Sequence, residues 1–191
     1  MKLSEFKKLR ARIERAHASV LEKANPGFAR SQKAESGAGY DLEVVGVKSP
    51  EQLEDEILNL FIWVWSMKDY LKALCRVSGA DPKRIERIVN AEPSLMIVAD
   101  VANRAKHGNL TQSRTGDYAK LDSVRVSIPL EAIGSIAFQE SEIRVDVAIP
   151  DDTELVAMIT FDSQCTPQDA FAVVRHAISA WEKNAFPLVG V

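Results

Sequence analysis

The chain has 191 residues, of which 46% are hydrophobic and 27% are charged, a balance typical of globular domains and unlike that of disordered chains. Its longest apolar run, Leu60 to Trp65, is too short to cross a bilayer, and its first residues are charged and do not resemble a signal peptide. We therefore expect a single cytoplasmic domain with no membrane partner.

Charge is unevenly distributed along the chain. The formal net charge is −3, but residues 1–33 carry nine Lys and Arg against three Glu. That segment therefore has a charge of +6, which leaves −9 for the rest of the chain. A basic segment of this kind is typical either of a solvated helix face or of a surface that contacts nucleic acid.

The two cysteines and the motif content argue against a metal or a cofactor. Cys75 and Cys165 are far apart, and neither has a partner at metal-ligand spacing. This pattern favours small buried or half-buried thiols over a disulfide or a zinc site. The chain also lacks a P-loop, a GxGxxG motif and a Ser-His-Asp order, so we expect no cofactor.

The first half of the chain has helical periodicity. Apolar residues recur at helical spacing over residues 3–24, and "NPG" at 25–27 ends that pattern. Ser49, Pro50 and Gln52 have the layout of a capping box, which predicts a long helix over residues 50–78 with apolar residues on more than one side.

A further helix is predicted over residues 82–108. Asp81 and Pro82 repeat the start signal, and Pro93 predicts a break near Glu92, because the residue before a proline disfavours the α conformation. Between the first two helices, residues 27–48 are rich in Ser, Gly and Ala, so we expect a mobile connection with one strand-like stretch at 42–47.

The periodicity changes to that of strands after Gly108. Alternating and Val/Ile-rich stretches separated by turn residues predict an antiparallel β-meander of about four short strands over residues 121–162. Thr166 can then cap, and Pro167 can open, a closing helix that runs to about residue 186. The expected fold class is α+β and mainly helical, with the meander inserted before the C-terminal helix. Four residues on apolar helix stripes should be buried: Trp65, Leu71, Val101 and Trp181.

The stretch "VADVANRAKHGNL", from Val98 to Leu110, collects polar residues just before its helix ends. At about 100° per residue, Asp100, Asn103, Arg104 and His107 fall within roughly a 100° arc of one helix face. Two interpretations of this polar face remain open. In the first, which is structural, Asp100 and Arg104 form an i,i+4 pair on a solvated face, with His107 near the helix C-terminus and Gly108 after it.

The alternative interpretation is chemical. Cleavage of RNA by its own 2′-hydroxyl needs proton transfer and stabilisation of the phosphate charge, without a metal. The imidazole of His107 can move a proton, the guanidinium of Arg104 can hold a phosphate, and Asn103 can orient an oxygen, with Asp100 or Lys106 assisting. His17 and His176 lie on other helices and are weaker candidates.

These residues also resemble a known family. A long Trp-containing helix ("FIWVWSMKDYL"), a following helix that ends in Asn-x-x-x-His ("ANRAKH") and a closing helix with a Trp ("AISAWEKNAF") are similar to the HEPN superfamily. In HEPN ribonucleases an arginine, usually followed by a polar residue, precedes the histidine. Asn103 and His107 match the polar residue and the histidine, but Ala102 stands at the arginine position, so Arg104 would have to supply the charge.

The resemblance implies a HEPN-like helical bundle, a homodimer with the motif helices facing each other, and a toxin–antitoxin or phage-defence setting. With an intact site, it implies a metal-independent endoribonuclease that uses His107, Asn103 and Arg104. With a degenerate site, it implies a non-catalytic module that binds RNA or a partner protein.

Overall fold

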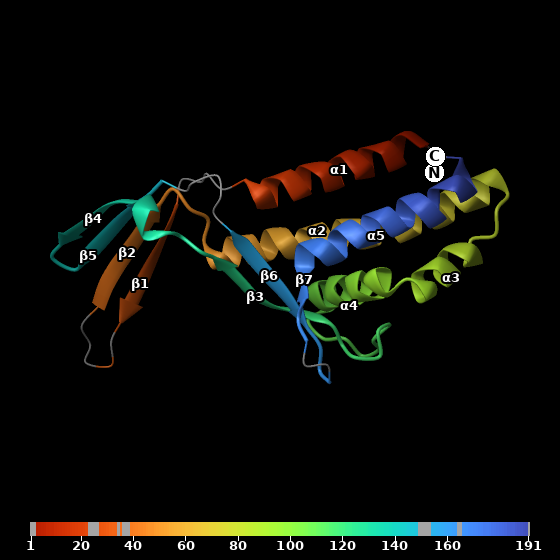
Figure 1. Cartoon of the computed structure of the whole chain (residues 1–191). Helices are drawn as coiled ribbons and strands as arrows, with labels where there is room; N and C mark the ends of the chain where they lie inside the picture. The colour runs from red at the N-terminus through yellow and green to blue at the C-terminus, as the bar shows by residue number, and fades with distance from the viewer. Residues whose placement is uncertain are drawn as a thin grey trace.

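The computed structural model describes residues 3–22, 27–33, 35, 39–148, 154–163 and 166–190. In this part of the chain, long helices pack into one body and short strands extend from it (Figure 1). The helices are α1 (Leu3–Leu21), α2 (Pro50–Ser78), α3 (Lys83–Ala91), α4 (Pro93–His107) and α5 (Ala170–Asn184), with 3-10 turns η1 (Leu130–Ala132) and η2 (Phe186–Val189). The strands are β1 (Phe28–Lys33), β2 (Gly39–Val45), β3 (Lys120–Val126), β4 (Ile133–Gln139), β5 (Glu142–Val147), β6 (Leu155–Thr160) and β7 (Gln168–Asp169). The prediction of a mainly helical α+β protein is confirmed.

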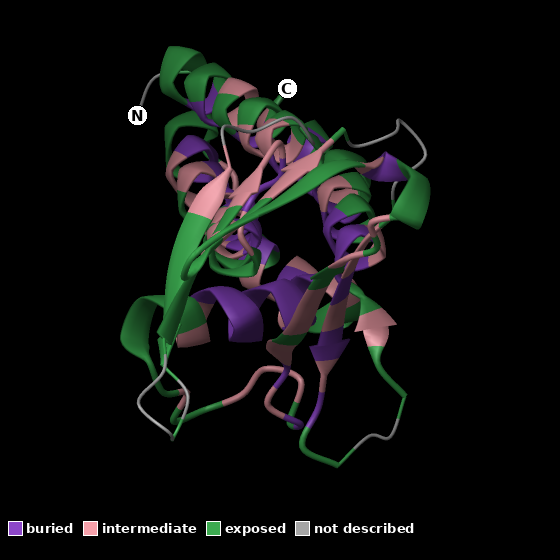
Figure 2. Cartoon of the chain, turned by 90° about the vertical axis from the view of Figure 1, so that its left-hand side faces the viewer, coloured by how far each residue is buried: buried purple, intermediate pink, exposed green. Residues whose placement is uncertain are grey.

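Helix α2 lies at the centre of the hydrophobic core. It packs against α1 and α4, and α5 packs against α4, so the apolar stripes of the four helices meet. The predicted burial of Trp65, Leu71, Val101 and Trp181 is confirmed, since none is more than 5% exposed. Buried residues are accordingly concentrated in the helices, whereas the strands farthest from them are mostly exposed or intermediate (Figure 2).

The helix ends largely follow the local sequence signals. The Ser49 hydroxyl accepts a hydrogen bond from the Gln52 amide at 3.0 Å, which confirms the predicted N-cap of α2. The break at Glu92 separates α3 from α4, as Pro93 predicts. Gly108 follows α4 with φ 74°, a backbone conformation that favours glycine, and its amide donates to the Arg104 carbonyl at 2.8 Å.

The predicted antiparallel meander was wrong. Strands β3 to β6 are divided between a four-stranded sheet of order β1-β2-β5-β4 and a three-stranded sheet of order β3-β6-β7. Strands β4 and β5 form an antiparallel hairpin, but β5 then pairs in parallel with β2. Alternation along a strand shows which side chains share a face and does not show which strand lies beside it.

The described residues of the segment 27–48 form two strands, where the sequence predicted a mobile connection with one strand-like stretch. Within the described residues of this segment, β1 and β2 form an antiparallel ladder from Phe28 opposite Val44 to Lys33 opposite Gly39. The strand-like stretch at 42–47 is part of β2 over residues 42–45. Strand β2 of this hairpin pairs with β5, which lies about 100 residues later in the chain. The composition of residues 27–48 alone therefore did not predict both strands.

The closing helix begins later than expected. Its N-cap is Asp169, whose carboxylate accepts from the Ala172 amide at 2.5 Å, and β7 occupies the two residues before Ala170. Thr166 and Pro167 therefore precede the helix and do not open it. No helix in the described ranges combines the length and the apolar character that a bilayer crossing requires.

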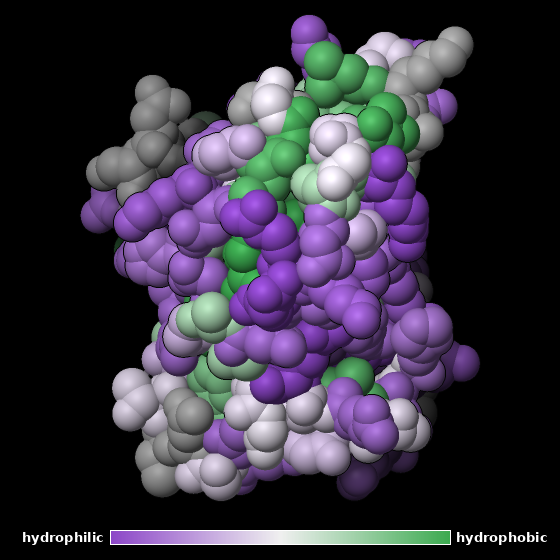
Figure 3. Space-filling model, turned by 90° about the vertical axis from the view of Figure 1, so that its right-hand side faces the viewer, coloured by the Kyte–Doolittle hydropathy of each residue, from purple (hydrophilic) through white to green (hydrophobic). Residues whose placement is uncertain are grey.

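The end of the molecule where the two chain termini lie is mostly hydrophilic. Hydrophobic side chains form a strip that runs down from the top of this face, with smaller separate patches near its lower end (Figure 3).

Candidate functional site

The predicted polar cluster lies on α4, which is packed into the core over most of its length. Leu95 and every residue from Ile97 to Ala102 are buried, including the charged Asp100. Beyond Ala102 the helix emerges from the core, and Asn103 and Arg104 are half-buried while His107 is exposed. The four candidate residues therefore share a helix face but differ sharply in their access to solvent.

Asp100 is fully buried, and its carboxylate accepts four hydrogen bonds from the connection between α4 and β3. Its oxygens accept from the amides of Arg114, at 2.7 Å, and Thr115, at 3.2 Å. The hydroxyls of Ser113 and Thr115 donate to it at 2.5 and 2.6 Å. No ion pair joins Asp100 to Arg104 among the described residues. Asp100 therefore holds a turn in place, and both of its carboxylate oxygens accept hydrogen bonds from that turn.

The side chain of Arg114 extends this anchorage to two further helices, α2 and α3. Its guanidinium donates to Glu86 at 3.0 Å and to Asn90 at 2.9 Å, both on α3, and lies 5.2 Å from the ring centre of Trp65 on α2. Burial acts to raise the pKa of Glu86, but the hydrogen bond from Lys72 and the charge of Arg114 together hold this pKa below its usual value. This cluster is a structural connection between α2, α3 and the turn that Asp100 anchors.

The remaining part of the predicted site is open at the end of α4. Asn103, Lys106 and His107 make no hydrogen bond or ion pair through their side chains within the described residues, and the Nε of Arg104 is buried without a hydrogen-bond partner there. Ala102, which stands at the arginine position of the HEPN motif, is fully enclosed in the core. An arginine at that position of this fold would have to point into packed apolar side chains.

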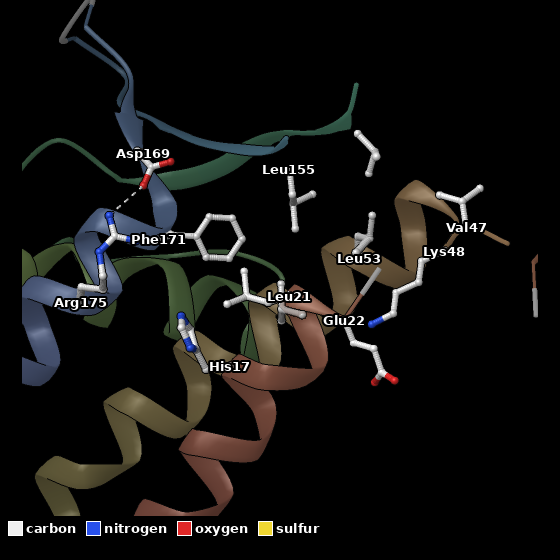
Figure 4. Close-up of a pocket in the computed structure, with 12 residues that line it drawn as sticks. His17, Leu21, Glu22, Val47, Lys48, Leu53, Leu155, Asp169, Phe171 and Arg175 are labelled. Carbon is white, nitrogen blue, oxygen red and sulfur yellow. Dashed lines mark ion pairs between the residues drawn. The ribbon is translucent and has the colours of Figure 1, made fainter. Parts of the chain in front are cut away.

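A further cavity with titratable groups in its lining lies elsewhere, between α1, the start of α2, α5 and the strands. It is a cavity of about 400 Å³ in which charged and polar groups flank apolar side chains (Figure 4). His17 and Arg175 lie at one end and Lys48 at the other, with Leu21 and Phe171 between them. His17 is a weak candidate in the sequence, where it lies among Ala and Arg on the first helix. The structure brings it into one cavity with Lys48 and with Arg175, which is more than 100 residues away in the chain.

The charges in this cavity are mostly neutralised by the protein itself. Lys48 is buried, and its Nζ donates to Glu56 at 2.7 Å and to the backbone carbonyl of Ser19. Arg175 faces Asp169 at 4.0 Å. The cavity is thus not strongly selective for either sign of charge. The described residues also contain no group of three or more His, Cys, Asp or Glu that could hold a metal ion.

A third feature is the outer face of α1. Lys7, Lys8, Arg12 and Arg15 are all exposed, and none forms an ion pair with another described residue. Arg12 lies over the ring of Trp63 on α2, with 4.4 Å between the guanidinium carbon and the ring centre. In the basic segment of the sequence, Arg10 and Arg30 form ion pairs with Glu182 and Glu51, but the four cations on the outer face of α1 have no acidic partner among the described residues and lie next to an aromatic ring.

Comparisons with protein-family models, with curated proteins and with solved structures each gave no significant match.

Proposed function

We propose that the protein is a non-catalytic RNA-binding module whose contact surface is the outer face of α1. The observation that carries the proposal is the stripe of Lys8, Arg12 and Arg15, which follow one another at i, i+4 and i+7 and have no acidic partner in the described residues. At 1.5 Å per residue these cations extend over roughly 10 Å of helix, so they can follow a phosphate backbone. Trp63, beneath Arg12, adds a stacking surface of the kind that single-stranded RNA uses.

The state of α4 supports a binding role over an enzymatic one. Asp100 is enclosed and bonded to the 113–115 turn, so it is not free to orient or assist a catalytic imidazole. Ala102 is buried, so the helix does not present a guanidinium where the HEPN motif has one. A HEPN-like bundle whose site is degenerate remains part of this proposal, together with a toxin–antitoxin or phage-defence setting and a partner protein.

Salt-dependent RNA binding tests the proposal. Fluorescence anisotropy with a labelled single-stranded RNA should show an affinity that falls with salt, by a logarithmic slope of about 0.7 for each phosphate neutralised. The triple variant Lys8→Gln, Arg12→Gln, Arg15→Gln should lower that slope by about 2 and weaken binding at least about tenfold at low salt.

A matched variant controls for the loss of net charge. Arg76, Lys83 and Arg84 are also exposed cations, but they lie around the α2–α3 connection. Replacing all three by Gln removes the same charge and should leave the RNA affinity nearly unchanged. Equal weakening by both triple variants, or the absence of RNA binding by the folded wild type, would contradict the proposal.

A second candidate function is a metal-independent endoribonuclease. It is favoured by one observation, namely that His107 and Asn103 remain accessible beside Arg104 with no other described residue occupying their side chains. Its test is incubation of single-stranded RNA with the wild type in EDTA. Cleavage that His107→Ala abolishes, and that Arg104→Ala slows by a factor on the order of 10² or more, would establish the enzyme and overturn the non-catalytic proposal.

A further inference from the structure

Strand β4 is an open edge of the four-stranded sheet. The order β1-β2-β5-β4 leaves β1 and β4 each with one unpaired side, and β4 lies far from the helices (Figure 1). Such an edge presents unpaired backbone N–H and C=O groups, which can pair with another strand. The two edges of this sheet differ in how they are protected against pairing with another chain.

The β4 edge lacks the usual protection. Its sequence from Ile133 to Gln139, "IGSIAFQ", contains no charged residue and no proline, whereas β1 carries Arg30 and Lys33. A bulge between Ile133 and Ser135 disturbs only the start of β4, so the ladder is regular from Ser135 to Gln139. Exposed, uncharged and regular edges of this length are those that pair with other chains.

Large apolar side chains are exposed on the same strand. Phe138 is 76% and Ile136 is 50% exposed. They lie opposite Ile143 and Val145 of β5, so they share one face of the sheet. Near the helices, β3 and the start of α2 lie over this face of the sheet, and Val145 lines a cavity of about 300 Å³ between them. Phe138 is not part of the lining of that cavity.

The sequence of β4 is complementary to itself. In a twofold antiparallel pair centred on Ala137, Ile136 of each copy lies opposite Phe138 of the other, and Ser135 lies opposite Gln139. Pairs of an aromatic with a β-branched residue are favourable cross-strand neighbours. The next charged residue, Glu140, would lie beside Gly134 of the second copy, so no like charges meet.

We propose that β4 pairs with β4 of a second copy of this chain, in an antiparallel register with its twofold axis at Ala137, to form a continuous eight-stranded sheet. A second copy is the occupant that this surface specifies, because one strand supplies both members of the apolar pair and both sets of backbone groups. This interface is distinct from the α4-to-α4 dimer that the HEPN resemblance implies, and it does not depend on RNA binding.

Light scattering after size exclusion tests the dimer. The wild type should shift from the monomer mass of 21.1 kDa toward twice that value as its concentration rises to about 200 µM, since small interfaces give weak affinities. Phe138→Lys should remain monomeric over this range. Val77→Lys replaces a similarly exposed apolar residue, 69% exposed on α2, and should dimerise like the wild type.

Disulfide trapping tests the register. At the twofold axis the two Ala137 Cα atoms would lie about 4.5–5.5 Å apart, within the range of about 4.4–6.8 Å that a disulfide spans. In a Cys165→Ser background, Ala137→Cys should therefore form a covalent dimer on mild oxidation, while Ser31→Cys on the opposite edge should not. A wild type that stays monomeric throughout, a Phe138→Lys variant that still dimerises, or equal trapping at both edges would overturn the proposal.

Discussion

Replacement of Asp100 by alanine separates a structural role from a catalytic one. The carboxylate is fully buried and is the common acceptor for two amides and two hydroxyls of residues 113–115. The two hydroxyls also lie 2.9 Å from each other, so they can retain one partner after the change. The donors left without an acceptor in Asp100→Ala are therefore mainly the amides of Arg114 and Thr115.

The magnitude follows from these contacts. Hydrogen bonds to a charged group contribute about 1.5–3 kcal/mol each, and a buried donor left unpaired costs about 1–3 kcal/mol. Because the turn is half-buried, water can bind some of the donors that lose their acceptor. Removing the carboxylate also removes the cost of burying its charge, which offsets a further part of the destabilisation. We expect Asp100→Ala to lower the free energy of unfolding by about 2–4 kcal/mol, and Asp100→Asn, which keeps one acceptor oxygen, by about half as much.

Urea denaturation measures this change. With an m-value of about 2 kcal/mol/M, the midpoint of Asp100→Ala should fall by about 1–2 M, and the amides of Arg114 and Thr115 should exchange hydrogen faster. Asn103→Ala, one helical turn later, makes no described side-chain hydrogen bond and should change stability by less than about 0.5 kcal/mol. A change below about 1 kcal/mol for Asp100→Ala, together with loss of RNA cleavage, would refute the structural role.

Three further predictions concern single side chains. Trp181 is fully buried, so Trp181→Ala should cost about 3–5 kcal/mol, and an unchanged thermal midpoint would mean that α5 does not dock through this ring. The lowered pKa of Glu86 means that the stability advantage of wild type over Glu86→Gln should be complete above pH 4.5 and should shrink as the pH falls through the lowered pKa; an advantage independent of pH in melts across this range would contradict it. Burial raises the pKa of the Cys75 thiol, so a thiol reagent should modify Cys75 only after unfolding, and rapid labelling of the native protein would argue against its position in the core.

The helices could be predicted from the sequence because their signals are local. Ser49 and Gln52 are three residues apart and form the N-cap contact that their spacing indicates. Pro93 separates α3 from α4 through an effect on the preceding residue alone. The start of α5 was misplaced because local signals alone do not decide it. Thr166 and Asp169 are both suitable N-cap residues, and the pairing of β7 with β6 places the helix start at Asp169.

The sheets could not be predicted, because their partners are distant in the chain. Val44 on β2 pairs in register with Val145 on β5, and no spacing or propensity rule relates two segments so far apart. The β4–β5 hairpin, by contrast, is joined at Glu140 and Ser141 and was within reach of local turn signals. For β3 to β6 the error therefore lies in the arrangement of the strands and not in their existence, whereas β1 and β7 were not predicted at all.

The candidate site, too, could be predicted only in part from the sequence. Helical spacing correctly places Asp100, Arg104 and His107 on one face, but it does not show that the chain following Gly108 returns over the first part of that face. Once the 113–115 turn covers Asp100, only the last turn of α4 remains for chemistry, and it carries an imidazole without an ionised carboxylate to orient it. This placement is one reason why we propose recognition of RNA over its cleavage, and the EDTA assay with His107→Ala tests for cleavage directly.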